Sequence, residues 1–342
     1  MKLQDIIKNA QVISLDTLKN DDELVREIQT RLSTLLLYPS GKWIDGDYGN
    51  RTEAALKEFC ELFELNNLQN GQFDPVFAET LLNAEPNDLP SPGQSLTDAD
   101  YERAAQLLNV QVAIVLAVHE VESAGKGFLA DGRPKILFER HIFFRETGGR
   151  FAVTHPDICN RKSGGYLGNE REWPRLERAI ALDREAGLKS ASWGLGQVMG
   201  FNFKVAGFNN VEEFVLAMHQ NEGRQLDAMM NFILNADSRM APELQRQDWM
   251  TFARHYNGEG GVPKYGLKLE AAYKKQVNIE VQMLLQKVAQ KQGNPKFDPG
   301  KSDGVIGSKT RSAISEFQEA NGLSSSGVAD KNTVAKLKQA LA

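Results

Sequence analysis

The sequence is poor in features that mark several classes of protein. Only two residues are cysteine, Cys60 and Cys159, and one pair so far apart in the chain is no disulfide framework. No apolar run reaches the roughly 20 residues of a membrane-spanning helix. The N-terminal segment MKLQDIIKNA is interrupted by charges, unlike the apolar core of a signal peptide. These absences predict buried free thiols, no membrane insertion and synthesis in the cytoplasm.

An excess of positive charge is missing as well. The formal charge at pH 7 is −5, and residues 1–94 carry 16 acidic against 8 basic side chains. Residues 276–342 carry 9 basic against 6 acidic side chains, and the residues between are balanced. Without a dense basic face, the chain is a poor candidate for binding DNA or RNA.

Close groupings of metal ligands are absent too. The segment HEVES begins like the zinc-protease motif HExxH, but Ser123 stands where that motif requires its second histidine. The five histidines never form a close ligand pair, and isolated histidines are usually structural or exposed to solvent. We therefore expect neither a metal nor a cofactor.

The sequence does contain an internal repeat at its two ends. DGDYGNRTEAALKEF (45–59) aligns without a gap with DGVIGSKTRSAISEF (303–317). The Asp-Gly pairs predict turns, and the spacing of the alanine and phenylalanine positions predicts a helix with one buried face. Each copy follows an amphipathic segment that contains a glutamine and precedes a glycine turn and a last helix. We therefore expect three helices in each unit.

These repeats resemble the peptidoglycan-binding domain found at the ends of many cell-wall hydrolases. The resemblance implies that Asp45, Gly46, Asp303 and Gly304 belong to wall-binding modules. The N-terminal copy departs from the family pattern, because ELFELNN stands where the C-terminal copy has FQEANGL. The Pro- and Ser-rich stretch EPNDLPSPGQSLTDAD has the composition of a linker and ends in a capping box with Thr97.

The central part contains two glutamates at the end of an apolar run, in AVHEVESAGKGF (117–128). VQVAIVLAVHEVES is long enough for a helix and is apolar on every side, which predicts a core helix. Glu122 falls in its last turn, where the helix dipole and apolar packing both disfavour ionisation, as suits a general acid. Glu120 lies about 200° away on a helical wheel and faces elsewhere. Two exposed charges at a helix end are the simpler alternative.

Three downstream segments mix aromatic, glycine and single polar residues: ILFERH (136–141), ASWGLGQVMG (191–200) and FARHYNGEGG (252–261). Together with VES they resemble the lysozyme superfamily, particularly goose-type lysozymes and lytic transglycosylases. The run VESAGKGFLADGRPKILFERHIFF resembles the N-acetylmuramidase domain of phage endolysins. This resemblance implies that Glu122 is the acid, that Ser192 and Gln197 contact sugar, and that Tyr256 and Asn257 line the cleft and steady the glutamate.

The second carboxylate is less well defined. Cleavage of a glycosidic bond needs a proton for the leaving oxygen, and charge stabilisation or water activation on the other face of the sugar. Asp131, Glu139 and Glu146 are all available, and the resemblance favours Glu139. Its apolar neighbours allow an alternative, in which Glu139 is a structural charge compensated by Arg140.

The sequence thus predicts a mainly α protein. We expect an N-terminal peptidoglycan-binding module (1–90), a linker (91–96), a lysozyme-like catalytic domain (97–275) and a C-terminal module (276–342). The expected function is that of an endolysin that hydrolyses the β-1,4 bond between N-acetylmuramic acid and N-acetylglucosamine, acting as a monomer on bacterial peptidoglycan after release from the host cytoplasm. The alternatives are a lytic transglycosylase that gives 1,6-anhydro products and a non-catalytic wall-binding protein.

Overall fold

The computed structural model describes residues 1–35, 37–38, 44–84, 95–123, 126–258 and 262–341. It is mainly α, as predicted, and divides into two compact units. One unit comprises Met1–Leu96 with Lys126–Phe232, and the other comprises Thr97–Gly125 with Ile233–Ala342. Among the described helices, no single one has the length and apolar composition of a membrane span. Helices α7 (Asp98–Leu108) and α8 (Val112–Glu122) meet these criteria only when taken together, across a bend of 105°.

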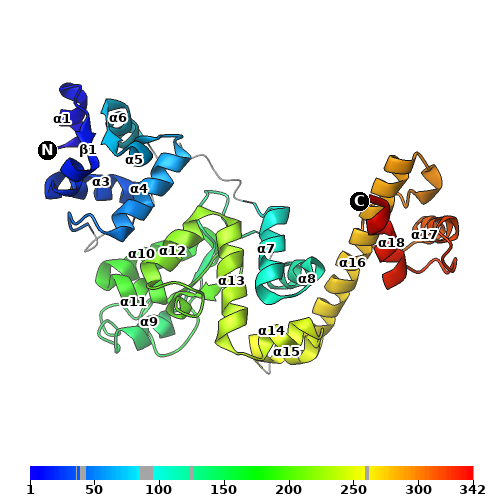
Figure 1. The fold of residues 1–342 in the computed structure, drawn as a ribbon. Helices are drawn as coiled ribbons and strands as arrows, with labels where there is room; N and C mark the ends of the chain where they lie inside the picture. Colours follow the sequence, from blue (N-terminus) through cyan, green and yellow to red (C-terminus); the bar gives the residue numbers. More distant parts are fainter. Residues whose placement is uncertain (36, 39–43, 85–94, 124–125, 259–261, 342) are drawn as a thin grey trace. The chain divides into compact units, whose positions relative to one another are not determined.

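The N-terminal module, drawn in blue at the start of the chain in Figure 1, is built around one apolar core. Its elements are α1 (Leu3–Lys8), β1 (Ile13–Ser14), α2 (Leu15–Lys19), α3 (Asp22–Thr34), α4 (Asn50–Leu62), α5 (Asn67–Asn70), β2 (Gln72–Phe73) and α6 (Pro75–Asn83). The three helices expected in the repeat are α3, α4 and α6, and the module adds α1, α2 and α5 to them. Leu3 and Leu18, from α1 and α2, are fully buried in the core, and β1 pairs with β2 through Ile13 and Phe73. The first helices therefore extend the core that the repeat itself forms.

The central part joins helices to a small sheet. Its elements are α7 (Asp98–Leu108), α8 (Val112–Glu122), β3 (Ile136–Phe138), α9 (Arg140–Glu146), η2 (Asn169–Arg171), α10 (Glu172–Leu182), α11 (Arg184–Lys189), β4 (Ala191–Trp193), β5 (Val198–Met199), η3 (Gly200–Asn202), α12 (Val211–Gln220), α13 (Glu222–Ala236), α14 (Met240–Gln245) and α15 (Trp249–Asn257). The strands form one antiparallel sheet in the order β3-β4-β5. The predicted capping box is confirmed, because Thr97 and Asp100 cap the start of α7 reciprocally.

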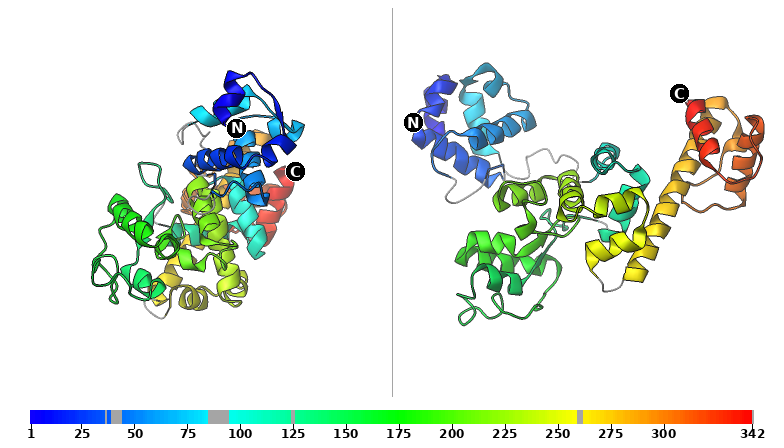
Figure 2. Two further views of the ribbon diagram at one scale, coloured as in Figure 1. Left: turned by 90° about the vertical axis from the view of Figure 1, so that its left-hand side faces the viewer. Right: turned by 60° about the horizontal axis from the view of Figure 1, so that its bottom comes forward.

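The C-terminal module begins inside a helix that it shares with the central part. Its elements are the end of α16 (Val262–Gln292), η4 (Pro295–Phe297), α17 (Ser308–Ala320) and α18 (Lys331–Leu341). Figure 2 shows α16 as one unbroken helix. Residues 275 and 276, between which we expected a domain boundary, both lie within it. Most of the linker expected at 91–96 lies outside the described residues.

Each of the two modules has a buried glutamine that holds its own Asp-Gly turn. In the N-terminal module, Gln29 accepts a hydrogen bond from the Gly46 amide at 2.9 Å and donates to Asp45 at 2.9 Å. In the C-terminal module, Gln282 accepts from the Gly304 amide at 2.8 Å and lies 3.4 Å from Asp303 Oδ1. Both glycines have left-handed φ angles, 79° and 80°, which only glycine adopts at no cost. The four turn residues predicted for wall binding thus organise the turn itself.

The C-terminal copy has a second buried glutamine that the N-terminal copy lacks. Gln318 in α17 accepts a hydrogen bond from the Gly327 amide at 3.0 Å and donates to Thr333 at 2.9 Å. The matching positions of the N-terminal module are Cys60 and Phe77, and both are buried. The departure of the N-terminal copy from the family pattern is therefore a change from a polar to an apolar contact. Both cysteines are buried and free, as predicted.

Candidate active site

Helix α8 positions the first candidate carboxylate. Val115, Ala117 and Val118 are buried on its packed side, which confirms the predicted core helix. The helix ends at Glu122, because Ser123 takes an extended conformation and donates a hydrogen bond from its hydroxyl to the His119 carbonyl at 2.7 Å. Glu122 is thus fixed in the last turn, where the unpaired carbonyls of a helix disfavour a negative charge.

The carboxyl group of Glu122 is held in a largely apolar place. Its Oε1 atom is buried and has no hydrogen-bond partner among the described residues. This burial raises the pKa of Glu122 to about 7, although the side chains of Tyr265 and Asn257 hydrogen-bond to the carboxyl group and oppose the shift. At neutral pH the group therefore exists in both protonation states, as a proton donor requires.

Glu120, two residues earlier, is in the opposite situation. Its carboxylate lies 2.8 Å from Lys275 Nζ and 2.8 Å from Gln276 Nε2, both on α16. Partial burial alone would raise its pKa, but the hydrogen bonds from Lys275 and Gln276 hold the pKa of Glu120 below its ordinary value. Glu120 is therefore an ionised surface residue that joins α8 to α16.

Helix α15 ends beside Glu122. Asn257, its last residue, hydrogen-bonds to the carboxyl group, and the preceding Tyr256 stacks on Phe252 with ring centroids 5.5 Å apart. Burial, and then the charge of Glu122, raise the pKa of Tyr256 well above its ordinary value. His255 Nδ1 lies 2.9 Å from the buried Glu243, which fixes the end of the helix. The structure thus brings Tyr256 and Asn257 to Glu122.

Tyr265 belongs to the same group, and the sequence analysis missed it. It lies in the first turn of α16, and its hydroxyl hydrogen-bonds to Glu122. Burial and this hydrogen bond raise its pKa above the ordinary value of a tyrosine, so the hydroxyl stays protonated as a donor. No local pattern in KYGLKLE marks this tyrosine, because only the packing of α16 against α8 brings it to the carboxyl group.

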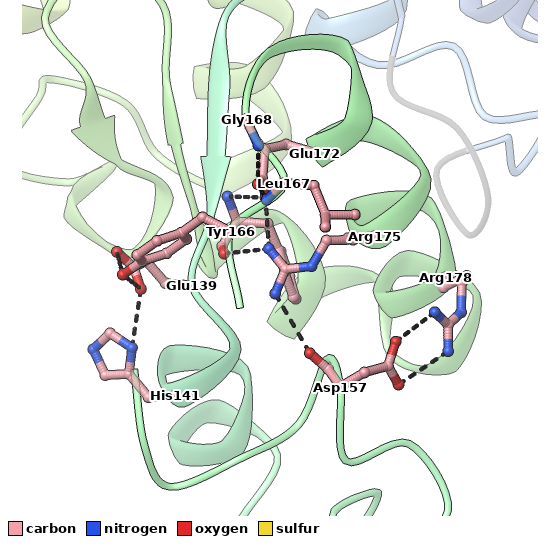
Figure 3. A network of polar contacts seen from close by, with 10 residues as sticks. Glu139, His141, Asp157, Tyr166, Leu167, Gly168, Glu172, Arg175 and Arg178 are labelled. Carbon is pink, nitrogen blue, oxygen red and sulfur yellow. Dashed lines mark hydrogen bonds and ion pairs between the residues drawn. The ribbon is translucent and has the colours of Figure 1, made fainter. Parts of the chain in front are cut away.

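Glu139 lies where β3 passes into α9 (Figure 3). Its amide donates to the Ser190 carbonyl at 2.8 Å, and its side chain is 16% exposed. The Tyr166 hydroxyl lies 2.9 Å and 2.8 Å from the two carboxylate oxygens. His141 Nδ1 is 3.0 Å from Oε2, without the geometry of a hydrogen bond.

The alternative that Arg140 compensates Glu139 is wrong. Arg140 points to the following loop, where it donates to the carbonyls of Lys162 and Ser163 at 2.8 Å and 3.0 Å. Among the described residues, no ion pair or hydrogen bond joins Arg140 to Glu139. Glu139 thus faces a hydroxyl and an imidazole.

The other two carboxylates have partners of their own. Asp131 is paired with Arg133 at 2.7 Å, and hydrogen bonds from Arg133 lower its pKa. Glu146 is paired with Arg145 at 2.8 Å. Neither has the buried surroundings of Glu122. Within the described residues, no three His, Cys, Asp or Glu side chains are grouped so that they could hold a metal ion.

Ser192 and Gln197 lie on the hairpin formed by β4 and β5. The Ser192 hydroxyl donates to Gln197 Oε1 at 2.8 Å, and Gln197 Nε2 donates to the Gly194 carbonyl at 2.8 Å. Gln197 is exposed and has a φ of 47°, an unusual value for a residue with a Cβ atom. The hairpin thus presents an amide whose orientation is fixed by the protein. Ser192 and Leu137 are register partners, so this amide and Glu139 belong to the same sheet region.

Comparison with known proteins shows which family the chain belongs to. The model of the N-acetylmuramidase family matches residues 111–277, and the model of a putative peptidoglycan-binding domain matches residues 21–81 and 279–337. The crystal structure of an endolysin from the Burkholderia phage AP3 is similar at 36% sequence identity and a TM-score of 0.52. The match covers 78% of this chain and 99% of that chain. Among curated proteins, none matches the chain.

The order of the matched domains indicates the class of enzyme. A muramidase domain between two peptidoglycan-binding regions is the organisation of a glycoside hydrolase that acts on the bacterial cell wall. The chain belongs to the family of phage endolysins with an N-acetylmuramidase domain. It is a cell-wall-hydrolysing enzyme with muramidase activity.

Proposed function

We propose that Glu122 is the general acid of a reaction that hydrolyses the β-1,4 bond between N-acetylmuramic acid and N-acetylglucosamine. The observation that carries this proposal is the state of its carboxyl group, which burial brings to a pKa of about 7. A glycosidic oxygen leaves only when it receives a proton, and an acid that is still protonated at neutral pH supplies one. Tyr265 and Asn257 then stabilise the carboxylate that remains.

Glu139 is the second carboxylate of this proposal. An oxocarbenium-like centre needs a negative charge or an activated water molecule on the face opposite the leaving group. The Glu139 side chain is partly exposed and is contacted by a hydroxyl donor, which suits a group that acts as a base or stabilises charge. Asp131 and Glu146 are already paired with arginines and are weaker candidates.

The β4–β5 hairpin and the two end modules are the parts of this proposal that bind peptidoglycan. Gln197 is exposed, and its amide nitrogen donates to the Gly194 and Lys135 carbonyls while its oxygen accepts from Ser192. The remaining lone pair of that oxygen is available to a sugar hydroxyl. We propose that the turns at Asp45-Gly46 and Asp303-Gly304 shape wall-binding surfaces. Two modules on one polymer raise the local concentration of the enzyme at its substrate.

The bond that is cleaved is tested with purified protein and isolated sacculi. Hydrolysis gives new reducing ends at N-acetylmuramic acid, and mass spectrometry finds muropeptides that retain the added water. The 1,6-anhydro products of a lytic transglycosylase are lighter by one water and have no reducing end. Their appearance as the main product would replace hydrolysis with intramolecular transfer.

The role of the C-terminal module is tested with a chain that ends at Gly293. This cut leaves α16 intact, so the contacts of Tyr265 and Lys275 with the two glutamates of α8 remain. We expect weaker retention on sacculi with unchanged turnover of short soluble glycan fragments. A fall in both by the same factor would contradict a separate binding role.

A further inference from the structure

The Glu139 carboxylate accepts a hydrogen bond from the hydroxyl of Tyr166, a residue 27 positions later in the chain. No sequence motif marks this tyrosine. Figure 3 shows Tyr166 directed at Glu139, and its hydroxyl lies within 2.9 Å of both carboxylate oxygens. A phenol has a single proton, so the two contacts are one hydrogen bond shared between two acceptors. Burial, and then the hydrogen bond to Glu139, raise the pKa of Tyr166. The hydroxyl is therefore a donor throughout the neutral range.

The loop that carries Tyr166 is fixed by a buried ion pair. The amides of the next two residues, Leu167 and Gly168, donate to Glu172 Oε1. Glu172 is completely buried and pairs with Arg175 at 2.6 Å. Burial alone would raise the pKa of Glu172, but the amides of Gly168 and Leu167, with Arg175, hold it below its ordinary value. Tyr166 is thus attached to the core by the backbone that follows it.

The same ion pair also fixes the strand before Glu139. Glu172 Oε2 accepts a hydrogen bond from the Phe138 amide at 3.3 Å, and Arg175 donates to the Phe138 carbonyl at 3.1 Å. One buried pair therefore contacts the residue before Glu139 and the residue after Tyr166. Arg140, the residue after Glu139, holds the start of the same loop through the Lys162 and Ser163 carbonyls. Hydrogen bonds to the backbone beside each residue therefore hold Tyr166 and Glu139 next to each other.

We infer that Tyr166 is a positioning residue for Glu139, which it holds in one orientation through its hydroxyl. This inference rests on the proposed role of Glu139. A glutamate side chain rotates about several bonds, and a group that activates water or faces a developing charge acts best in one of these orientations. A hydroxyl prepositioned by the core restricts that rotation without using a charge that would neutralise the carboxylate. Tyr166 is itself 45% exposed, so its ring is also open to solvent.

The experiment is a double-mutant cycle on solubilised glycan chains with Tyr166→Phe and Glu139→Ala. A hydrogen bond to a charged group that is partly exposed corresponds to about a three- to tenfold change in rate. We expect Tyr166→Phe to lower kcat by that factor with KM within about twofold, because the hydroxyl acts in the chemical step rather than in uniform binding. In the Glu139→Ala background the same substitution should change kcat by less than about twofold.

Tyr273→Phe is the matched control. Its hydroxyl also makes two hydrogen bonds, to Gln111 and Gln247, and within the described residues it contacts neither Glu122 nor Glu139. We expect full activity from this variant and, for Tyr166→Phe, a Tm within about 3 °C of the parent. Tyr166→Leu separates the hydroxyl from the ring, and the inference predicts that it is no more than about twofold worse than Tyr166→Phe.

Three results would overturn the inference. One is an equal loss from Tyr166→Phe with and without Glu139, because the hydroxyl would then act on the substrate directly. Another is full activity of Tyr166→Phe with a large loss in Tyr166→Leu, which would assign the ring to sugar stacking. The third is a change confined to KM. If Glu139→Ala alone keeps wild-type kcat, the proposed role of Glu139 fails, and this single variant identifies that failure separately.

Discussion

Glu122 and Glu139 are the same residue type at two helix ends, but their surroundings differ in kind. Glu122 is the last residue of α8, has a buried oxygen without a partner among the described residues, and has its pKa raised to about 7. Glu139 comes just before α9, and a tyrosine hydroxyl contacts both of its oxygens. At Glu122 burial outweighs the hydrogen bonds from Tyr265 and Asn257 and keeps a proton on the carboxyl group, whereas Glu139 accepts a hydrogen bond from a neutral hydroxyl. This difference fits the proposed roles, in which Glu122 donates the proton and Glu139 carries the negative charge.

The largest expected effect comes from removing the proton of Glu122. Glu122→Gln keeps the size and polarity of the side chain but has no acidic proton, and a general acid contributes about 10²- to 10⁴-fold in rate. We expect kcat on sacculi to fall by this factor while binding to sacculi is retained. A folded Glu122→Gln protein with activity near wild type would remove Glu122 from the mechanism.

The stability of the same variant depends on pH in a defined direction. Because the pKa of Glu122 rises from 4.5 to about 7 on folding, the folded chain binds more protons between these values, and its free energy of unfolding falls as pH rises through them. The loss is on the order of 3 kcal/mol above pH 7. Glu122→Gln lacks this loss. Its Tm should equal that of the parent near pH 4 and exceed it at pH 8, as calorimetry at both values would show; a constant difference would contradict the raised pKa.

A smaller loss is expected at Glu139. Because its hydrogen-bond donor, Tyr166, is uncharged and its side chain is partly exposed, Glu139→Gln removes a charge without leaving a buried ion unpaired. We expect kcat to fall about tenfold to a hundredfold, up to the lower limit of the roughly 10²- to 10⁴-fold effects of acid–base catalysis. The same change at Glu146, which is paired with Arg145, serves as the control. A greater loss at Glu146 than at Glu139 would exchange their roles.

Tyr265 provides a finer test of the Glu122 site. Its hydroxyl lowers the pKa of Glu122, so Tyr265→Phe should raise that pKa and move the alkaline fall of kcat to higher pH, by about half to one unit. Tyr101→Phe is a suitable control, because that hydroxyl contacts His119 on the same helix at 2.7 Å. An alkaline limb that moves to lower pH would contradict the hydrogen bond to Glu122.

Local patterns in the sequence predicted the helix that carries Glu122, and long-range packing supplied the partners of both glutamates. The apolar run before Glu122 is buried as expected, and Thr97 caps α7 as its spacing with Asp100 predicts. Periodicity shows that a helix face is buried, but it does not show which distant side chain covers it. Tyr265 and Tyr166 were therefore missed, since each meets its carboxylate only after tertiary packing. The strand at Ile136 was missed too, because three residues are too few for a period.

The smallest effect should come from Glu120, two residues from Glu122 in the same helix. Its carboxylate is 38% exposed and paired with Lys275 on α16, and an ion pair of this kind contributes about 0–1 kcal/mol. Glu120→Gln keeps an acceptor for Gln276 and should leave kcat within about twofold of the parent, with a Tm lower by only a few degrees. Rates and melting curves measured beside those of Glu122→Gln compare the two faces of α8 directly. If Glu120→Gln abolished activity in a folded protein while Glu122→Gln retained it, the assignment of the acid to the buried face would be wrong.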